Sequence, residues 1–381
     1  MRFCVATHLR CESWINAESG KYTRLTLTER HGKAILPFLS VVDLRADPPE
    51  RNTWLAPSLV QATREALSRK EQVLFFLNRR GYAPLTLCRK CGWRAGCPNC
   101  SAWLVEHKVG GALICHQCGY RTPAPKACPD CESTEHLAAC GPGVERIAEE
   151  AAERFPLADV QILSSDLAPD STALKQQILD IANGNADIIV GTQIVAKGHN
   201  FPNLTLVGVV DADLGLMGGD LRASERTFQM LNQVAGRAGR ADKPGRAMLQ
   251  TSHPEHPVLK AILGGDAVRF RQSLADERRM AGMPPFARLV AVIVRGEKED
   301  KVWDVAKALA HEAGVMAEAG ADVFGPAPAP FAMLRGEHRV RLLVRLERGA
   351  DHAALIESWR ARIKVPSNVR VVFDVDPYSF L

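Results

Sequence analysis

The chain has 381 residues, a net charge of +5 and 46% hydrophobic residues. Its length allows two or three domains, and its composition is that of an ordinary soluble globular protein. The longest apolar runs are too short to span a bilayer and the N-terminus has no signal-peptide core, so we expect a cytoplasmic, reducing setting and no membrane partner. The mild positive charge permits a nucleic-acid partner but does not argue for one.

Residues 1–45 carry only weak patterns. Ser13–Ala17 fits the end of a helix, Tyr22–Leu27 alternates like a strand, and Phe38–Leu44 is a second candidate strand. The Pro48-Pro49 pair then indicates a linker before the more regular part of the chain.

From residue 57 onward, helix and strand patterns alternate. Pro57–Arg69 has helical apolar spacing with proline in its first turn, and Gln72–Leu77 is an apolar run typical of a buried parallel strand. Further along, the alternation predicts helices over Val144–Phe155, Thr172–Asn183 and Ser224–Arg237, and strands over Val160–Ser164, Asp187–Gly191, Leu204–Val210 and Arg246–Gln250. Such alternation predicts an α/β fold with a parallel sheet covered on both faces.

Four Cys-x-x-Cys pairs interrupt this pattern, at Cys88/Cys91, Cys97/Cys100, Cys115/Cys118 and Cys128/Cys131. Two cysteines at this spacing can direct both thiolates to one metal, and a second pair completes a tetrahedron. The gap from Cys100 to Cys115 is close to that of zinc ribbons, so the spacing favours one zinc shared by the inner pairs and another shared by the outer pairs. A disulfide framework or a redox Cys-x-x-Cys is the alternative, but nothing suggests secretion and no redox enzyme needs four pairs.

The C-terminal part has a different order of elements. Val258–Ala281 is mostly helical, and Gly282–Pro285 breaks the chain. The order that follows is βαββαβ, the split ferredoxin-like arrangement, with Ala327–Pro330 as a rigid connector inside it. Its elements are a strand at Arg288–Val294, a helix at Lys301–Ala317, strands at Asp322–Phe324 and Arg339–Leu346, a helix at Ala353–Ile363 and a strand at Val369–Asp374.

Arginines gather on and around one strand of this domain: Arg335, Arg339, Arg341, Arg345 and Arg348. Arg339, Arg341 and Arg345 share one face by the two-residue period of a strand. The cluster is either a solvated face or a surface for nucleic acid or an acidic peptide.

Two stretches of the α/β part could act on phosphates. In Gln233–Arg240, two arginines three apart lie on one side of a helical turn, which suits a phosphate that develops charge; a basic helix end with glycine stops is the alternative. Ile189–Pro202 is a strand that runs into a polar loop containing Lys197 and His199, and ligands of parallel sheets bind at such strand ends. Lys197 as a solvated loop residue, and His199 as a hydrogen-bonded one, are the plainer readings.

Together these motifs resemble the PriA family (primosomal protein N-prime), the replication-restart DNA helicases of superfamily 2. The resemblance rests on Phe76–Tyr82, Gly191–His199 and Gln233–Arg240, which look like helicase motifs IV, V and VI, and on the four cysteine pairs. It implies a RecA-like second helicase lobe with an inserted two-zinc region. The domains expected on this basis are a lobe 1 remnant and linker at 1–45, lobe 2 at 46–87 and 141–253, the zinc insertion at 88–140, a helical connector at 254–284 and a C-terminal α+β domain at 285–381.

The resemblance also implies roles for individual residues. Arg237 and Arg240 would be arginine fingers on the ATP γ-phosphate, and Gly198 and Gln233 would line the nucleotide cleft. The residues that would face DNA are Asn78, Arg79, Arg80, Gly143 and Lys197, although the family usually has threonine at the position of Val144. The implied partners are branched or single-stranded DNA, single-stranded DNA-binding protein and other primosome proteins, with the chain itself a monomer.

The sequence departs from an intact helicase of this family. ATP hydrolysis needs a glycine loop ending in Gly-Lys-Ser/Thr and an acidic pair for Mg²⁺, whereas the only Gly-Lys pairs here, Gly20-Lys21 and Gly32-Lys33, precede tyrosine and alanine. Val5–Trp14 looks like an altered motif III, so we expect a truncated or incompletely recorded gene. The chain alone is then expected to be inactive as an ATPase, with ATP and Mg²⁺ bound only beside a first lobe. The alternative is a non-enzymatic zinc- and DNA-binding module that recruits primosome proteins.

Overall fold

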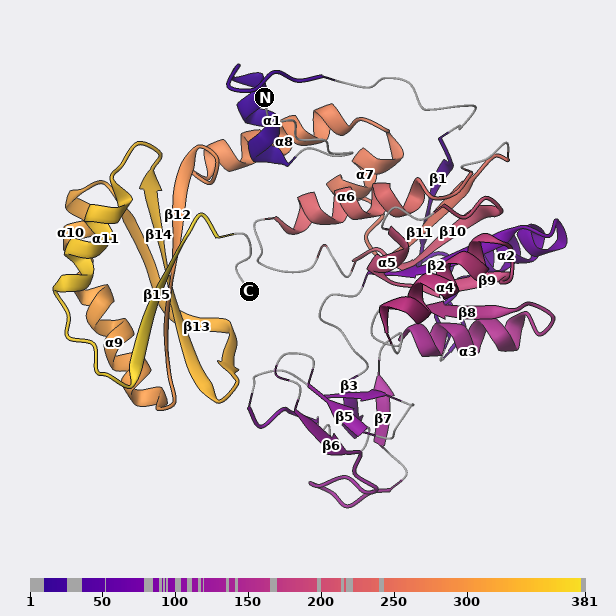
Figure 1. Cartoon of the computed structure of the whole chain (residues 1–381), viewed down its shortest axis with the longest axis horizontal. Helices are drawn as coiled ribbons and strands as arrows, with labels where there is room; N and C mark the ends of the chain where they lie inside the picture. The colour runs from indigo at the N-terminus through magenta and orange to yellow at the C-terminus, as the bar shows by residue number, and fades with distance from the viewer. Residues whose placement is uncertain are drawn as a thin grey trace. The chain divides into compact units, whose positions relative to one another are not determined.

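The computed structural model forms two compact units (Figure 1), one within residues 20–82 and 142–271 and the other within 11–19, 83–141 and 272–381. No helix in the described part of the chain is both long and apolar enough to cross a bilayer. The residues that the structure describes are 10–25, 36–51, 53–78, 85–88, 91, 93, 95–99, 104–107, 112–115, 118, 120–134, 137–140, 143–164, 170–196, 200–213, 216, 222–239 and 243–377.

The first unit is built on a six-stranded parallel sheet, as the alternating pattern predicted. The strand order is β1-β11-β10-β2-β9-β8, and every neighbouring pair is parallel. All six residues of β2 are buried because both faces of a central parallel strand are covered. The strands are β1 (Phe38–Asp43), β2 (Gln72–Leu77), β8 (Val160–Leu163), β9 (Ile188–Gly191), β10 (Leu204–Asp211) and β11 (Arg246–Thr251).

Two separate cores cover the two faces of this sheet. Along β2, Leu74 and Phe76 point into one core, whereas Val73, Phe75 and Leu77 point into the other. The first core includes residues of α4 (Ser171–Ala182), α5 (Gln193–Ala196), α6 (Ala223–Ala235) and α7 (Pro257–Leu263). The second includes residues of α2 (Pro57–Ser68) and α3 (Val144–Arg154). The predicted α/β architecture is confirmed.

The cysteine-rich region forms a small antiparallel sheet of its own. Its order is β6-β5-β4-β3-β7, from β3 (Leu85–Cys88), β4 (Val105–His107), β5 (Ala112–Ile114), β6 (Arg121–Pro123) and β7 (Leu137–Cys140). Its described core holds only five buried residues, Ala95, Cys97, Leu104, Leu113 and Cys115. A core of this size cannot hold a fold by apolar burial alone, so metal is the expected source of stability.

The C-terminal domain has the predicted βαββαβ order. Its antiparallel sheet runs β13-β14-β12-β15, and Figure 1 shows all three helices on one face of it. The elements are β12 (Ala287–Gly296), α9 (Glu299–His311), α10 (Gly314–Glu318), β13 (Asp322–Leu334), β14 (Glu337–Glu347), α11 (His352–Ala361) and β15 (Val369–Val375). The expected helix Lys301–Ala317 is therefore two helices.

The prediction of a rigid connector at Ala327–Pro330 is wrong, because these residues continue β13. Proline cannot donate to a strand ladder, but β13 is an edge strand and its pairing with β14 shifts register on either side of Pro328. The edge position therefore accommodates prolines that a central strand would exclude.

The N-terminal part and the connector also differ from expectation. Described residues 22–25 are not in a strand, contrary to the prediction for Tyr22–Leu27, and α1 (Cys11–Glu18) extends beyond Ser13–Ala17. β1 pairs with β11, so the sheet begins before residue 46. The predicted helical stretch Val258–Ala281 is divided between α7 and α8 (Ala267–Met280).

Candidate metal centres and the strand-end site

The described cysteines gather into the two groups that the spacing predicted. The sulfur atoms of Cys88, Cys91, Cys128 and Cys131 all lie within 4.8 Å of one another, and so do those of Cys97, Cys115 and Cys118. Cys100, the expected fourth member of the second group, is outside the described residues. Each group could hold one metal ion, which is consistent with two zinc sites.

The distances between sulfur atoms separate a metal site from a disulfide. Cys88 Sγ lies 3.6 Å from Cys131 Sγ, and Cys91 Sγ lies 3.5 Å from Cys128 Sγ. A disulfide bond is about 2.05 Å long. The edge of a tetrahedron with zinc–sulfur bonds of about 2.3 Å is about 3.8 Å, so the observed spacing fits four thiolates around one ion.

Three of the cysteine turns repeat one hydrogen bond. The backbone N–H of the first cysteine donates to the carbonyl five residues later, from Cys88 to Trp93 at 2.7 Å, from Cys115 to Tyr120 at 2.8 Å and from Cys128 to Ser133 at 2.9 Å. The repeated bond turns each Cys-x-x-Cys loop back on itself. Both thiols of each pair are thereby held on one side.

Burial favours the protonated form of the Cys97 thiol. Burial, followed by hydrogen bonds with Cys115 and Cys118, raises the pKa of Cys97 to about 12, although the Asn99 backbone N–H opposes the shift. A metal ion that binds Cys97 must displace this proton, so binding should weaken as the pH falls.

The strand-end site lies at the carboxyl edge of the parallel sheet. Asn78 follows β2 directly, and α5 begins two residues after Gly191 at the end of β9. Gly143 is the N-cap of α3. Gln233, in contrast, is exposed in the last turn of α6, which leads to a turn that is bonded to Leu204, the first residue of β10. Val144 is buried in the core beside α2, so the position where the resemblance implied threonine makes an apolar contact here. Arg79, Arg80, Lys197, Gly198, His199 and Arg240 lie outside the described residues.

Arg237 connects two of the predicted motifs. It is 5% exposed, and its guanidinium donates to the carbonyl of Ala196 at the end of α5. The residue expected to act as an arginine finger thus contacts the residue that precedes Lys197 in the chain. Its role toward ATP stays a prediction.

Two glycines let this turn approach the sheet. Gly239 has φ +70°, and its N–H donates to the Leu204 carbonyl at 3.0 Å. A Cβ added at Gly245 would lie 2.4 Å from the Ala238 carbonyl carbon. Gly245→Ala is expected to reduce the free energy of unfolding by about 2–3 kcal/mol because backbone must move. Thermal unfolding measures the loss, with Gly314→Ala as control because its added Cβ meets no atom within 4 Å.

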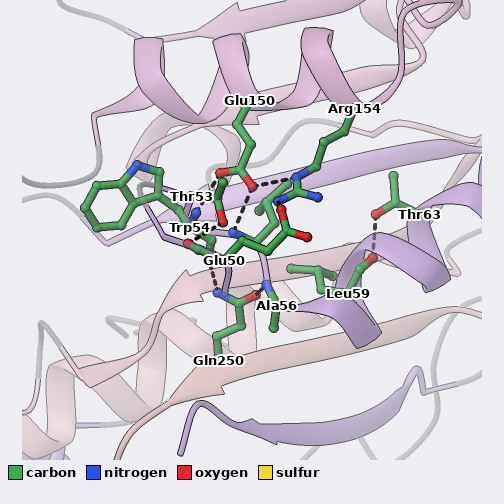
Figure 2. Close-up of polar contacts among 10 residues, drawn as sticks. Glu50, Thr53, Trp54, Ala56, Leu59, Thr63, Glu150, Arg154 and Gln250 are labelled. Atoms are coloured by element: carbon green, nitrogen blue, oxygen red, sulfur yellow. Dashed lines mark hydrogen bonds and ion pairs between the residues drawn. The ribbon is translucent and has the colours of Figure 1, made fainter. Parts of the chain in front are cut away.

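Sequence patterns missed a polar network that fixes the chain between Glu50 and α2 (Figure 2). Glu150 accepts the backbone N–H of Trp54 at 2.7 Å and of Leu55 at 3.3 Å, and Gln250 accepts that of Ala56 at 2.8 Å. Arg154 bridges Glu150 and Glu50. The partners are 95 to 194 residues apart in sequence, so no local pattern could reveal them.

A second missed cluster lies where β10 and β11 end. Asp213 accepts hydrogen bonds from the Thr251 hydroxyl and from the Ser252 backbone N–H, the latter at 2.7 Å. Burial lowers the pKa of nearby His256, against the charge of Asp213. The Asp-Ala-Asp sequence after β10 was the only signal of this cluster in the sequence.

Comparison with known families agrees with this architecture. Residues 97–123 match the PriA DNA helicase Cys-rich region (CRR) domain, residues 146–242 the helicase conserved C-terminal domain, and residues 279–378 the primosomal protein N C-terminal domain. The first match lies in the cysteine-rich region, and the second covers the part of the parallel-sheet unit that follows it in the chain.

Full-length relatives extend the match over nearly the whole chain. Replication restart protein PriA of Rickettsia felis is 41% identical over 97% of this chain and 56% of the relative. The same protein of Haemophilus influenzae is 37% identical over 96% of the chain and 50% of the relative, and that of Bacillus subtilis 34% over 97% and 46%. The chain spans about half the length of these relatives. It corresponds to a C-terminal portion of the PriA family of replication restart proteins.

Proposed function

We propose that the chain is the DNA- and zinc-binding portion of a replication-restart helicase and supplies its second motor lobe. The single observation that carries the proposal is the cysteine-rich module inserted into a parallel helicase sheet, within a chain similar to PriA proteins. In this role, Arg237 and Arg240 would act on ATP held by a first lobe, with Gly198 and Gln233 lining the cleft. Asn78, Arg79, Arg80, Gly143 and Lys197 would contact the DNA backbone.

ATP hydrolysis by the purified chain alone is expected to stay at background, with or without DNA. The sequence has no Gly-Lys-Ser/Thr loop to hold the β- and γ-phosphates, so arginine fingers have nothing to stabilise. Phosphate release measured with and without forked DNA tests this. DNA-stimulated hydrolysis that persists after further purification would show that a phosphate site exists in this chain.

DNA binding without ATP is the second expected result. Electrophoretic shift at low salt, where phosphate contacts are strongest, should show a complex with forked DNA. Absence of a shift on any DNA would remove the proposed function. A shift without any ATPase activity is expected both of a motor portion that lacks its first lobe and of the alternative recruitment module, whose further partners would be single-stranded DNA-binding protein and other primosome proteins.

A further inference from the structure

Three arginines form a row across the sheet of the C-terminal domain. Arg295 on β12 lies directly opposite Arg339 on β14 and directly opposite Arg370 on β15. Residues directly opposite one another in antiparallel strands point to the same face. Neighbouring strands are about 4.8 Å apart, so the three side chains leave the sheet within about 10 Å of one another.

The row faces away from the helices. The side chains beside it in sequence, Val294, Val340 and Val371, belong to the core that α9, α10 and α11 cover. The arginines therefore lie on the opposite face, which Figure 1 shows without a helix of this domain. Arg370 is exposed, and Arg295 and Arg339 are half-buried.

The charge of this row is poorly compensated. Arg295 forms an ion pair with Glu337 at 3.1 Å. Among the described residues, this is the ion pair that the three arginines make. Burial and then the charge of Arg295 lower the pKa of Arg339. Like charges directly opposite in a sheet are destabilising. By contrast, Arg345 on the same face has its own carboxylate, Asp322, at 2.6 Å.

We propose that Arg295, Arg339 and Arg370 bind the phosphate backbone of single-stranded nucleic acid. The inference deepens the proposed DNA binding and rests on it. Guanidinium groups match phosphate oxygens in a planar, bidentate way, and a row across strands can meet successive phosphates of one chain.

The rest of this face indicates the kind of recognition. RNA-recognition domains with the same strand order stack bases on aromatic residues of the two central strands. Here the outward positions of β12 and β14 hold aliphatic side chains, arginines and, at the two ends of β14, Glu337 and Glu347, but no aromatic ring. Binding should therefore depend on phosphate charge, with little preference for base sequence.

The test compares two double variants of the 381-residue chain that lose equal charge. Arg339→Ala/Arg370→Ala removes two members of the row, and Arg360→Ala/Lys364→Ala removes two exposed charges on and after α11. Affinity for a fluorescent single-stranded oligonucleotide is measured by anisotropy across a salt series. The row variant should bind about tenfold more weakly at low salt, and its log–log salt slope should fall by roughly 1.4 for two lost phosphate contacts.

Further measurements keep the result interpretable. Thermal unfolding of the row variant should be unchanged or improved, because repulsion between like charges is removed, and the single variant Arg370→Glu provides an alternative at an exposed position. Oligo-dT and oligo-dA should bind equally. The inference would be overturned if the row variant bound the oligonucleotide with wild-type affinity. It would also be overturned if the variant lost affinity only for an acidic peptide, tested in the same assay. Either result would leave DNA binding elsewhere on the chain intact. If the wild-type chain binds no DNA, the proposed function itself fails.

Discussion

Replacing Cys128 with serine is expected to lower the zinc content from about two ions per chain to about one. Cys128 is 1% exposed and lies with Cys88, Cys91 and Cys131 in a group whose sulfur atoms are within 4.8 Å of one another. Structural zinc needs all four ligands, and a serine hydroxyl is a poor replacement for a thiolate. Metal analysis of the purified protein by mass spectrometry gives the stoichiometry directly.

Loss of the ion should also unfold the part of the cysteine-rich region that this ion holds together, next to β3 and β7. Binding free energies of structural zinc reach about 10–16 kcal/mol, which exceeds what five buried residues can supply. Hydrogen exchange of the backbone amides in β3 and β7 should rise sharply in the variant. In this strand pair Cys88, a ligand of the lost ion, lies directly opposite Leu137. The parallel sheet of the first unit should keep its protection, since its cores contain none of these cysteines.

A buried cysteine outside both groups provides the control. Cys11 is also 1% exposed and is not in either cluster, so Cys11→Ser should retain about two zinc ions. Two ions in Cys128→Ser, or none in the wild type, would contradict the assignment of this group.

The features that could be predicted from sequence are those that produce a local pattern of residue types. The continuous apolar run of β2 indicated a central buried strand, and the spacing of the cysteine pairs indicated which would meet. Alternation along β14 placed Arg339, Arg341 and Arg345 on one face, and the burial pattern confirms it. For the strands, the residues that decide the structure are neighbours in the chain. The cysteine pairs meet across as many as 43 residues, but each pair is recognisable by its own local spacing.

The features that could not be predicted depend on long-range partners. The sequence around Pro328 predicts an interruption between strands. Only the sheet order shows that it belongs to an edge strand, β13. Two prolines predict a connector locally, whereas the sheet tolerates them where no partner needs their N–H. Likewise, nothing near Arg237 in sequence shows that its guanidinium contacts Ala196, 41 residues away.

The polar network of Figure 2 shows the same limit and gives the second large expected effect. Gln250 is 0% exposed, donates from Nε2 to the carbonyls of Trp54 and Val210 at 2.8 and 3.0 Å, and accepts the Ala56 N–H at 2.8 Å. Gln250→Leu keeps the side chain's size but removes the partner of all three backbone groups. Each buried group left unpaired costs about 1–3 kcal/mol, so three groups give about 3–9 kcal/mol. The bond to the Trp54 carbonyl is only part-buried, so the free energy of unfolding should fall by the lower part of this range, about 3–5 kcal/mol.

This loss is a large part of the stability of an ordinary domain, which is about 5–15 kcal/mol. Urea unfolding of the zinc-loaded chain measures it. Hydrogen exchange gives a local test, because the Ala56 amide should exchange faster in Gln250→Leu while the Trp54 amide keeps its bond to Glu150. Uniform acceleration across the whole sheet would instead indicate general unfolding.

An exposed glutamine separates the network from the chemistry of the substitution. Gln61 on α2 is exposed and donates only to Glu65, at 3.1 Å, so Gln61→Leu should change the free energy of unfolding by less than about 0.5 kcal/mol. If both variants lose equal stability, burial of the Gln250 amide is not what fixes the chain before α2. If only Gln250→Leu is destabilised, the Gln250 side chain on β11 determines the position of the segment between Glu50 and α2.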